Sequence, residues 1–248
     1  MRRIRVTLVT ALMALLCLAG TAHALTLVRV GGYLFPPYVD ILGTAITGKS
    51  IALIAAMNQI QNEYRFEFIP TTSPRRYEDL DERRFDIMLF ENLAWGWQGR
   101  PVEASRVFAT GGEVYVARKA TGRDQSYFET LHGKCLRGFE GYHYGFAHFN
   151  ADPASLGFNI GLTTSHERNL RAVLAGQCDI AVVTEAWIKT WVARHPASGR
   201  ELLVSEKRDQ TYAHTVLVRR GGPVTARRID AILDALEQRA ILKKILDE

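Results

Sequence analysis

Residues 31–40 read Gly31-Gly32-Tyr33-Leu34-Phe35-Pro36-Pro37-Tyr38-Val39-Asp40 and follow a strand-like run at residues 25–30. Glycines allow backbone angles that are closed to other residues, and consecutive prolines fix φ and remove donors, so the chain must leave the strand here on a stiff loop. Ligands of open α/β sheets lie beyond the carboxyl ends of the strands, which makes the three aromatic residues candidates for stacking on a small ligand. The alternative is that each ring caps the edge of a core.

The segments that follow alternate between helical and strand periodicity. Apolar residues recur at helical spacing in residues 50–62, which predicts a helix, and alternate with period two in residues 64–69, which predicts a half-buried strand. Residues 85–89 form a short apolar strand of the kind that is buried in a parallel sheet. A helix is expected before the last of these, with Ser73 as its N-cap and its end near residue 83. This βαβαβ order predicts a doubly wound α/β layer with helices on both faces of a parallel sheet.

The second half of the chain repeats this alternation and then returns to the first half. Residues 121–129 are polar and rich in turn residues, which suggests a linker. Two strand-like connections, near residues 112 and 213, join two similar βα units, so closure on a ligand would be a hinge motion. We expect strands at residues 113–118, 134–139, 179–183 and 211–219, a short apolar segment at 158–162, and helices at 166–175 (capped by Thr164 or Ser165), from Thr184-Glu185 onward, and from 223 to the end.

A second segment that could contribute to a binding site follows the carboxyl end of the strand predicted at residues 85–89. It reads Phe90-Glu91-Asn92-Leu93-Ala94-Trp95-Gly96-Trp97. Placed beside Phe35 and Tyr38, the tryptophans would form an aromatic box that holds one carboxylate. Such a box suits a cationic or amine-bearing ligand through cation–π and ion-pair attraction. The alternative is that the tryptophans fill a core covered by the loop and that Glu91 is solvated.

Residues 1–24 have the pattern of a secretory signal peptide: three arginines, an apolar run at residues 6–19 and the small-residue end Ala22-His23-Ala24. The run is shorter than the ~20 residues of a membrane span, so we expect a soluble periplasmic protein that begins at Leu25. This leader holds three of the 31 Lys and Arg and none of the 26 Asp and Glu, which leaves a net charge of +2 rather than +5. The composition therefore gives no indication of nucleic-acid binding.

Cys135 and Cys178 remain after the leader, in a compartment that permits disulfides, and each begins a predicted strand. If those strands are neighbours, the two sulfurs can bridge, which would close a loop of ~40 residues and stabilise the fold by a few kcal/mol. Two buried thiols are the alternative.

Several of these segments together resemble the periplasmic solute-binding proteins of ABC importers, in the polar amino-acid-binding branch. The resemblance spans the mature chain and rests on the order and spacing of the leader, Phe35-Pro36-Pro37-Tyr38 and residues 83–87, 131–134 and 169–180. It implies a type II two-lobed periplasmic binding fold, in which two doubly wound α/β lobes are joined by two crossover strands. Lobe 1 would comprise residues 25–112 and 213–248, and lobe 2 residues 113–212.

The resemblance also implies a set of ligand contacts. Phe35 falls where the family stacks an aromatic ring, Glu91 falls in the loop with first-lobe polar contacts, and Tyr142 and His143 fall at the helix start with second-lobe contacts. Two family anchors are missing. Trp95-Gly96-Trp97-Gln98 replaces the Thr-x-Glu-Arg segment whose arginine grips the ligand carboxylate, and Thr184, next to Glu185, replaces the aspartate that takes the amino group.

A tryptophan cannot donate the two parallel hydrogen bonds that an arginine makes to a carboxylate. Another arginine of the chain would therefore have to bind a ligand carboxylate. The candidates are Arg75, Arg76, Arg100 and Arg106, and Glu91 or Glu185 would take an amine. The predicted ligand-binding residues are Phe35, Tyr38, Arg76, Glu91, Asn92, Trp95, Trp97, Tyr142, His143, Thr184 and Glu185.

The sequence thus predicts a monomeric, non-catalytic protein that captures a small polar, amine-bearing solute, such as an amino acid or a derivative, for the membrane permease of an ABC importer. One alternative is an exported enzyme of the cyclohexadienyl dehydratase type, with Glu91, Glu185 or His143 as general acid. Another is an accessory protein that presents its ligand to a membrane receptor. The sequence has no nucleophile elbow, phosphate loop or zinc-site spacing of histidines, so we predict no cofactor and no metal.

Overall fold

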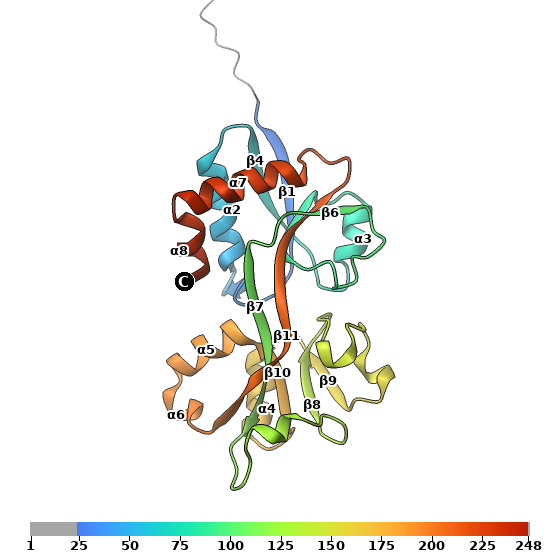
Figure 1. The fold of residues 1–248 in the computed structure, drawn as a ribbon, viewed down its shortest axis with the longest axis vertical. Helices are drawn as coiled ribbons and strands as arrows, with labels where there is room; N and C mark the ends of the chain where they lie inside the picture. Colours follow the sequence, from blue (N-terminus) through green and yellow to red (C-terminus); the bar gives the residue numbers. More distant parts are fainter. Residues whose placement is uncertain (1–23, 248) are drawn as a thin grey trace, which may run out of the picture.

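The computed structural model describes residues 24–247, which form two α/β lobes joined by two long strands (Figure 1). The predicted signal peptide lies outside the described residues, apart from Ala24. No helix within residues 24–247 is long and apolar enough to cross a bilayer.

The first lobe has a sheet in which β1 runs parallel to β4 on one side and to β5 on the other, as the βαβαβ order predicts. Helix α2 contacts β4, α7 and α8, while α3 lies on the other side of the sheet (Figure 1). A small hairpin, β2 (Asp40–Leu42) and β3 (Ala45–Thr47), follows the aromatic loop and was not expected. The other elements of this lobe are β1 (Thr26–Gly32), α2 (Lys49–Ile60), β4 (Tyr64–Pro70), α3 (Arg76–Asp81), β5 (Ile87–Glu91), β6 (Val102–Ala104), α7 (Ala226–Gln238) and α8 (Ile241–Asp247).

The second lobe continues the same sheet, in which β10 pairs with β7 on one side and β8 on the other, and β9 lies at the edge. The pair β10–β8 is parallel and the pair β10–β7 is antiparallel. Its elements are β7 (Ala109–Arg118), β8 (Leu136–Phe139), β9 (Ile160–Thr163), α4 (His166–Leu174), β10 (Ile180–Thr184), α5 (Glu185–Arg194), α6 (Pro196–Gly199) and the short 3₁₀ helices Gln125–Phe128, Gly145–Ala147 and Pro153–Leu156.

Strand β11 (Leu202–Arg219) belongs to both lobes. It pairs with β7 from Leu202 to His214 and then with β5 and β6 up to Arg219. The strand is twice as long as residues 211–219, because a polar stretch with two register shifts, between Val204 and Gln210, hides its first half from the hydrophobic pattern. The predicted division into residues 25–112 with 213–248 and residues 113–212 remains a proposal.

Three local predictions were wrong, and each has a physical reason. Helix α3 begins at Arg76 without a side-chain cap, because the hydroxyl of Ser73 donates to the carbonyl of Gly141 in the second lobe at 2.8 Å. The C-terminal helix is two helices, because Ala240 adopts a positive φ that turns α8 back onto α2. Residues 121–129 are not a linker, since Phe128 is buried there and stacks on Tyr115. Ser165, in contrast, caps α4 as predicted by accepting from the amide of Arg168.

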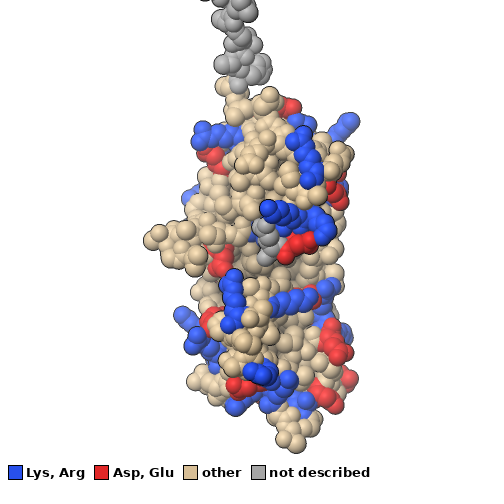
Figure 2. All heavy atoms as spheres, turned by 90° about the vertical axis from the view of Figure 1, so that its left-hand side faces the viewer, with Lys and Arg blue, Asp and Glu red and all other residues tan. Residues whose placement is uncertain are grey.

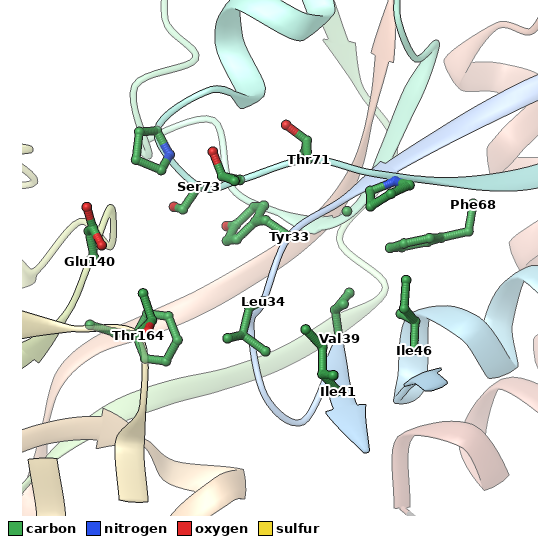
Figure 3. A pocket seen from close by; sticks show the side chains of 15 residues that line it. Tyr33, Leu34, Val39, Ile41, Ile46, Phe68, Thr71, Ser73, Glu140 and Thr164 are labelled. Carbon is green, nitrogen blue, oxygen red and sulfur yellow. The ribbon is translucent and has the colours of Figure 1, made fainter. Parts of the chain in front are cut away.

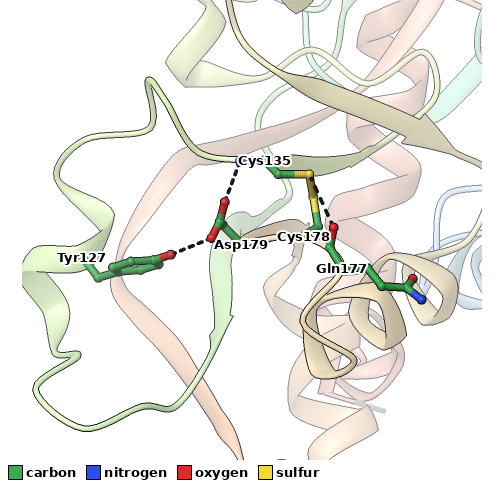
Figure 4. The surroundings of a disulfide bond; sticks show 5 residues. All are labelled: Tyr127, Cys135, Gln177, Cys178 and Asp179. Atoms are coloured by element: carbon green, nitrogen blue, oxygen red, sulfur yellow. Dashed lines mark hydrogen bonds between the residues drawn. A yellow bond between two sulfur atoms is a disulfide. The ribbon is translucent and has the colours of Figure 1, made fainter.

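The predicted disulfide is present between Cys135 and Cys178, which lie one and two residues before the neighbouring strands β8 and β10 (Figure 4). Asp179 holds the same corner together. Its carboxylate accepts from the amide of Cys135 at 2.8 Å and from the hydroxyl of Tyr127 at 3.2 Å. The bond therefore joins two strands that already pair, rather than tying down a loose loop.

Removal of this disulfide should destabilise the protein. The two cysteines are 43 residues apart, and the chain-entropy model assigns about 4 kcal/mol to a crosslink that closes a loop of this length. We expect Cys135→Ser with Cys178→Ser to lower the free energy of unfolding, measured in guanidinium, by about that amount. Reductant should bring the native protein to the level of the variant and leave the variant unchanged. Equal midpoints for all samples would contradict the prediction.

Candidate functional site

The aromatic loop after β1 is a tight turn that presents its rings between the lobes. The amide of Phe35 donates to the carbonyl of Val39 at 2.9 Å, and the peptide bond between Pro36 and Pro37 is cis. The ring of Phe35 meets that of Tyr142 in the second lobe, with centroids 5.2 Å apart, and that of Trp95 at 5.8 Å. All three rings are buried. The loop therefore closes the core edge and faces the other lobe at the same time.

We define the interlobe cluster as the side chains that line a small cavity where the lobes meet. The cavity has a volume of about 10 Å³, which is the size of a single water site. Its walls come from the first lobe, from the second lobe and from the connecting strands β7 and β11. The cluster consists of Tyr33, Phe35, Arg76, Trp95, Glu113, Tyr142, His143, Gln210 and Tyr212, with the backbone of Gly141.

Arg76, on the first turn of α3, is 1% exposed and forms the charged centre of the cluster. Its guanidinium carbon lies 4.8 Å from the ring centroid of Tyr33 and 4.4 Å from that of Tyr77. Nη1 donates to the hydroxyl of Ser73 at 2.6 Å, and Nε lies 3.6 Å from Oε1 of Glu91. The second oxygen of Glu91 accepts from the indole of Trp97 at 2.8 Å.

Both side chains of the ion pair between Arg76 and Glu91 are buried, each 1% exposed. Burial raises the pKa of Glu91, because loss of hydration outweighs the attraction of the guanidinium. The pair has a separation of 3.6 Å and is not a bidentate fork, so part of the hydrogen-bonding capacity of the arginine is unused. Of the four arginines considered from the sequence, Arg76 is the one that lines the cavity.

Of the remaining predicted residues of the first lobe, Trp95 lines the cavity, and Trp97, Tyr38 and Asn92 lie outside its lining. The indole of Trp95 donates to Oε1 of Gln210 at 2.9 Å. Trp97 lies one layer deeper against the ring of Tyr77, and Tyr38 packs on Phe90 and His214. The side chain of Asn92 accepts from the amide of Ala94 and holds the loop rather than facing the cavity.

In the second lobe the structure brings Tyr142 and His143 into the cluster and leaves Glu185 outside it. The ring nitrogens of His143 lie 3.4 Å from Arg76 Nη2 and from the Tyr77 hydroxyl. Burial and the nearby guanidinium lower the pKa of His143 to about 4, so the imidazole is neutral at pH 7. Thr184 is buried behind the cluster, with its hydroxyl 3.2 Å from His166 Nε2. Glu185 forms ion pairs with Lys189 at 2.6 Å and Arg208 at 2.7 Å.

The sequence analysis missed the contribution of the connecting strands. Glu113 on β7 and Gln210 and Tyr212 on β11 line the cavity, and His214 lies next to them, in contact with Tyr212 and Trp95. A signal was present, because residues 210, 212 and 214 alternate and so share one face of a strand. It was overlooked because the strand was expected to begin at residue 211.

Several buried polar atoms in and beside the cluster find no hydrogen-bond partner among the described residues. They come from both lobes and from β11. An unsatisfied buried donor or acceptor costs about 1–3 kcal/mol, so such groups rarely gather without a functional reason. The atoms are Nε of Arg76, Oε1 of Glu91, the hydroxyls of Tyr142 and Tyr212, Nδ1 of His166 and Nε2 of His214.

A larger pocket lies at the edge of the cluster (Figure 3). This edge pocket measures about 400 Å³ and has apolar walls from the first lobe, among them Leu34, Val39 and Phe68. Glu140 and Thr164 line it from the second lobe, and Tyr33 lines both the edge pocket and the central cavity. On the side face drawn in Figure 2, Lys and Arg are interspersed with Asp and Glu, without a large region of one sign.

The contact between Ser73 and Gly141 provides a test of lobe closure. A Cβ on Gly141 would lie 2.5 Å from Ser73 Oγ, so Gly141→Ala should wedge the lobes apart. We expect small-angle X-ray scattering to give a larger radius of gyration for this variant. Gly133→Ala is the matched control, because Gly133 also has a positive φ but a Cβ there meets nothing within 4 Å. The same radius for the two variants would refute this role of the contact.

His214 should make stability depend on pH. Burial lowers its pKa to about 3, whereas an unfolded chain has an ordinary histidine with a pKa of about 6.5. The unfolded state therefore binds the extra proton, and the stabilisation present above pH 6.5 is lost as the pH falls toward 3, at about 1.4 kcal/mol per pH unit. Relative to His214→Gln, the native protein should lose unfolding free energy at about this rate between pH 6 and 4. Parallel pH profiles of urea unfolding would contradict this.

Solved structures with the same architecture are two-lobed binding proteins. The chain is similar to the P235GK mutant of ArgBP from T. maritima (TM-score 0.69, 16% identity, 89% of this chain and 93% of that chain). It is also similar to a substrate binding protein of an ABC uptake transporter from Streptococcus pneumoniae with bound histidine (TM-score 0.70, 16% identity, 88% of this chain and 90% of that chain). A third similar structure is a histidine kinase sensor domain with similarity to periplasmic binding proteins (TM-score 0.70, 18% identity, 90% of this chain and 94% of that chain). No family model and no curated protein matches the chain. The chain thus has the two-lobed α/β fold of the type II periplasmic binding proteins, as its sequence predicts.

Proposed function

We propose that the protein binds a small polar, amine-bearing solute in the interlobe cluster and that the lobes close over it. The observation that carries this proposal is the group of buried, unpaired polar atoms that both lobes and β11 contribute in and beside one cavity. A solute with donors and acceptors would pair these atoms, and burial of its polar groups would then cost little.

The chemistry of the walls supports a solute with charged ends. The Nε of Arg76 faces Glu91 in an ion pair at 3.6 Å but makes no hydrogen bond, and arginine is the side chain best suited to bind a carboxylate. The rings of Tyr33, Phe35 and Trp95 provide flat apolar surfaces and faces that attract cations. In this role Arg76 takes the place of the arginine that the Trp95-Gly96-Trp97 segment lacks.

Binding requires the lobes to separate first. Ligand pockets usually measure about 300–1,000 Å³, and the closed cavity of about 10 Å³ is far below that range. Opening would be a hinge motion in β7 and β11, the two strands that connect the lobes. The solute would enter the open form and stabilise closure by contacts to both sides.

We further propose that the protein works in the periplasm and delivers its solute to the permease of an ABC importer. Proteins with this fold include transporter binding proteins and a sensor domain, so a receptor is the alternative partner. Catalysis is less well supported. Two of the groups considered as general acids, Glu91 and Glu185, are ion-paired, and the third, His143, is a neutral imidazole at pH 7.

A thermal-shift screen tests binding. The panel would contain L-arginine, L-histidine, L-glutamine, putrescine, glycine betaine and succinate. A ligand at 100 times its dissociation constant adds about 2.7 kcal/mol to the unfolding free energy, which raises the melting temperature by several degrees. We expect an amine to give this shift, and we expect Phe35→Ala, Trp95→Ala and Arg76→Met each to abolish it.

Arg75→Met is the matched control, because Arg75 is adjacent in sequence but its side chain is 55% exposed. This variant should retain the full shift. Circular dichroism would establish that each variant is folded before it is compared. If no solute of the panel stabilises the native protein, solute capture of this kind is rejected.

A further inference from the structure

Glu113 is a buried carboxylate of the interlobe cluster that forms no ion pair with any cation in residues 24–247. It lies on β7 opposite Gln210 of β11 and Thr184 of β10, is 1% exposed, and lines the cavity. The amide of Gln210 donates to its Oε2 at 2.7 Å, and the hydroxyl of Tyr212 also interacts with the carboxyl group. No ion pair among the described residues includes Glu113, whereas Glu91 is paired with Arg76.

The amide of Gln210 is fully used by groups other than a ligand. Its second hydrogen goes to the carbonyl of His143 at 2.5 Å, and its oxygen accepts from the indole of Trp95 at 2.9 Å. Gln210 therefore ties β11 to both lobes and holds the carboxyl group of Glu113 at the cavity wall. A carboxylate has about four acceptor sites, so with Gln210 and Tyr212 as partners that carboxyl group can still accept from a molecule in the cavity.

The groups that face Glu113 do not supply a positive charge. Asp209, which precedes Gln210 on β11, is a second acid near Glu113. Its carboxylate already accepts from the hydroxyl of Tyr115 at 2.5 Å and from the amides of Gly145 and Phe146. Tyr142, Tyr144 and Tyr212 surround the carboxyl group with aromatic side chains. His143 and Arg76 lie at the cavity wall, the first neutral and the second matched by Glu91.

A bare carboxylate in such surroundings is costly, because neither water nor a cation stabilises its charge. It must either carry a proton or meet a cation. Burial, reinforced by the charge of Asp209, raises the pKa of Glu113 well above its usual range, which favours the proton when no cation is present. The arrival of a cation would reverse that preference.

We propose that Glu113 binds the ammonium group of the solute and that one proton leaves its carboxyl group for each solute bound. The O–H bond of the acid breaks, the proton passes to the buffer, and the oxygen accepts an N–H of the ammonium, which keeps its charge throughout. The inference rests on the proposed function and names the solute as a protonated primary or secondary amine. Neither Glu91, which pairs with Arg76, nor Glu185, which pairs with Arg208 outside the cluster, has this role.

The proposal makes the affinity depend on pH. Below the raised pKa of Glu113, each amine displaces one proton, so the affinity should rise about tenfold per pH unit and level off above that pKa. Measurements between about pH 5.5 and 7.5 avoid protonation of His143, whose pKa is about 4. Glycine betaine has no N–H, so it cannot take this position in the same way.

The experiment is isothermal titration calorimetry of the mature protein with L-arginine, L-histidine and putrescine, in phosphate and in HEPES, neither of which is a primary amine. These buffers differ in ionisation enthalpy, so the difference in heat counts the protons released. We expect about one proton per amine for the native protein. Glu113→Gln keeps the shape and the contact with Gln210, and it should bind between tenfold and hundredfold more weakly and release no proton. Glu201→Gln, an exposed second-lobe carboxylate, should behave like the native protein.

The outcomes separate this inference from the function on which it rests. Amine binding with no proton release, or with equal affinity in Glu113→Gln, overturns the role of Glu113 and leaves solute capture standing. Binding of glycine betaine or succinate but of none of the primary amines also overturns it. If none of the six solutes binds, the proposed function fails and the role of Glu113 fails with it. The proton count of the native protein decides the matter even if the variant does not fold.

Discussion

The pairing of β7 with β11 is the constraint on which the rest of the structure depends. These strands lie side by side across the junction of the lobes and belong to the sheets of both. Alternate side chains at the middle of β11, Gln210, Tyr212 and His214, are therefore buried between the lobes. A polar residue placed there cannot escape to solvent when the lobes close, so its partners must come from the protein or from a guest molecule.

The closed junction combines favourable and unfavourable contacts. Rings from the aromatic loop, from the loop after β5 and from the second lobe bury apolar surface against one another, and Ser73 donates to Gly141 across the gap. Against these contacts stand an ion pair deprived of water and several polar atoms without partners. Because each such atom costs about 1–3 kcal/mol, the balance between open and closed lobes must be sensitive to anything that pairs them.

Much of the fold could be read from local patterns. The parallel pairing of β1 with β4 and β5, the cap of α4 by Ser165 and the bridge between Cys135 and Cys178 follow from periodicity, capping chemistry and the position of cysteines at strand starts. Two of the failures share a cause. Ser73 satisfies the other lobe instead of its helix, and the first half of β11 is polar because it lies in a twisted ribbon with two register shifts. Local sequence carries no information on partners that lie more than 60 residues away.

In the candidate site, too, some residues could be predicted from the sequence and others could not. Phe35 and Trp95, which line the cavity, were proposed because aromatic residues that leave strand ends are a local signal, whereas Tyr142 and His143 were proposed from the family resemblance alone. Glu113 was not proposed, because a glutamate at the start of a strand looks like a solvated end until β10 and β11 cover it from both sides.

A ligand can shift the balance of the lobes only through interactions that differ between the open and closed forms. The ring of Tyr33 packs on Phe35 and Arg76 of its own lobe, so it offers much the same stacking in both forms. Arg76 and Gln210 differ, because their partners include atoms of the opposite lobe, such as the ring of His143 for Arg76 and the indole of Trp95 for Gln210. To move a population from 1:99 to 99:1 takes about 5.5 kcal/mol of such differential binding. The polar centre of the cluster, rather than its aromatic rim, is therefore what couples occupancy of the cavity to closure.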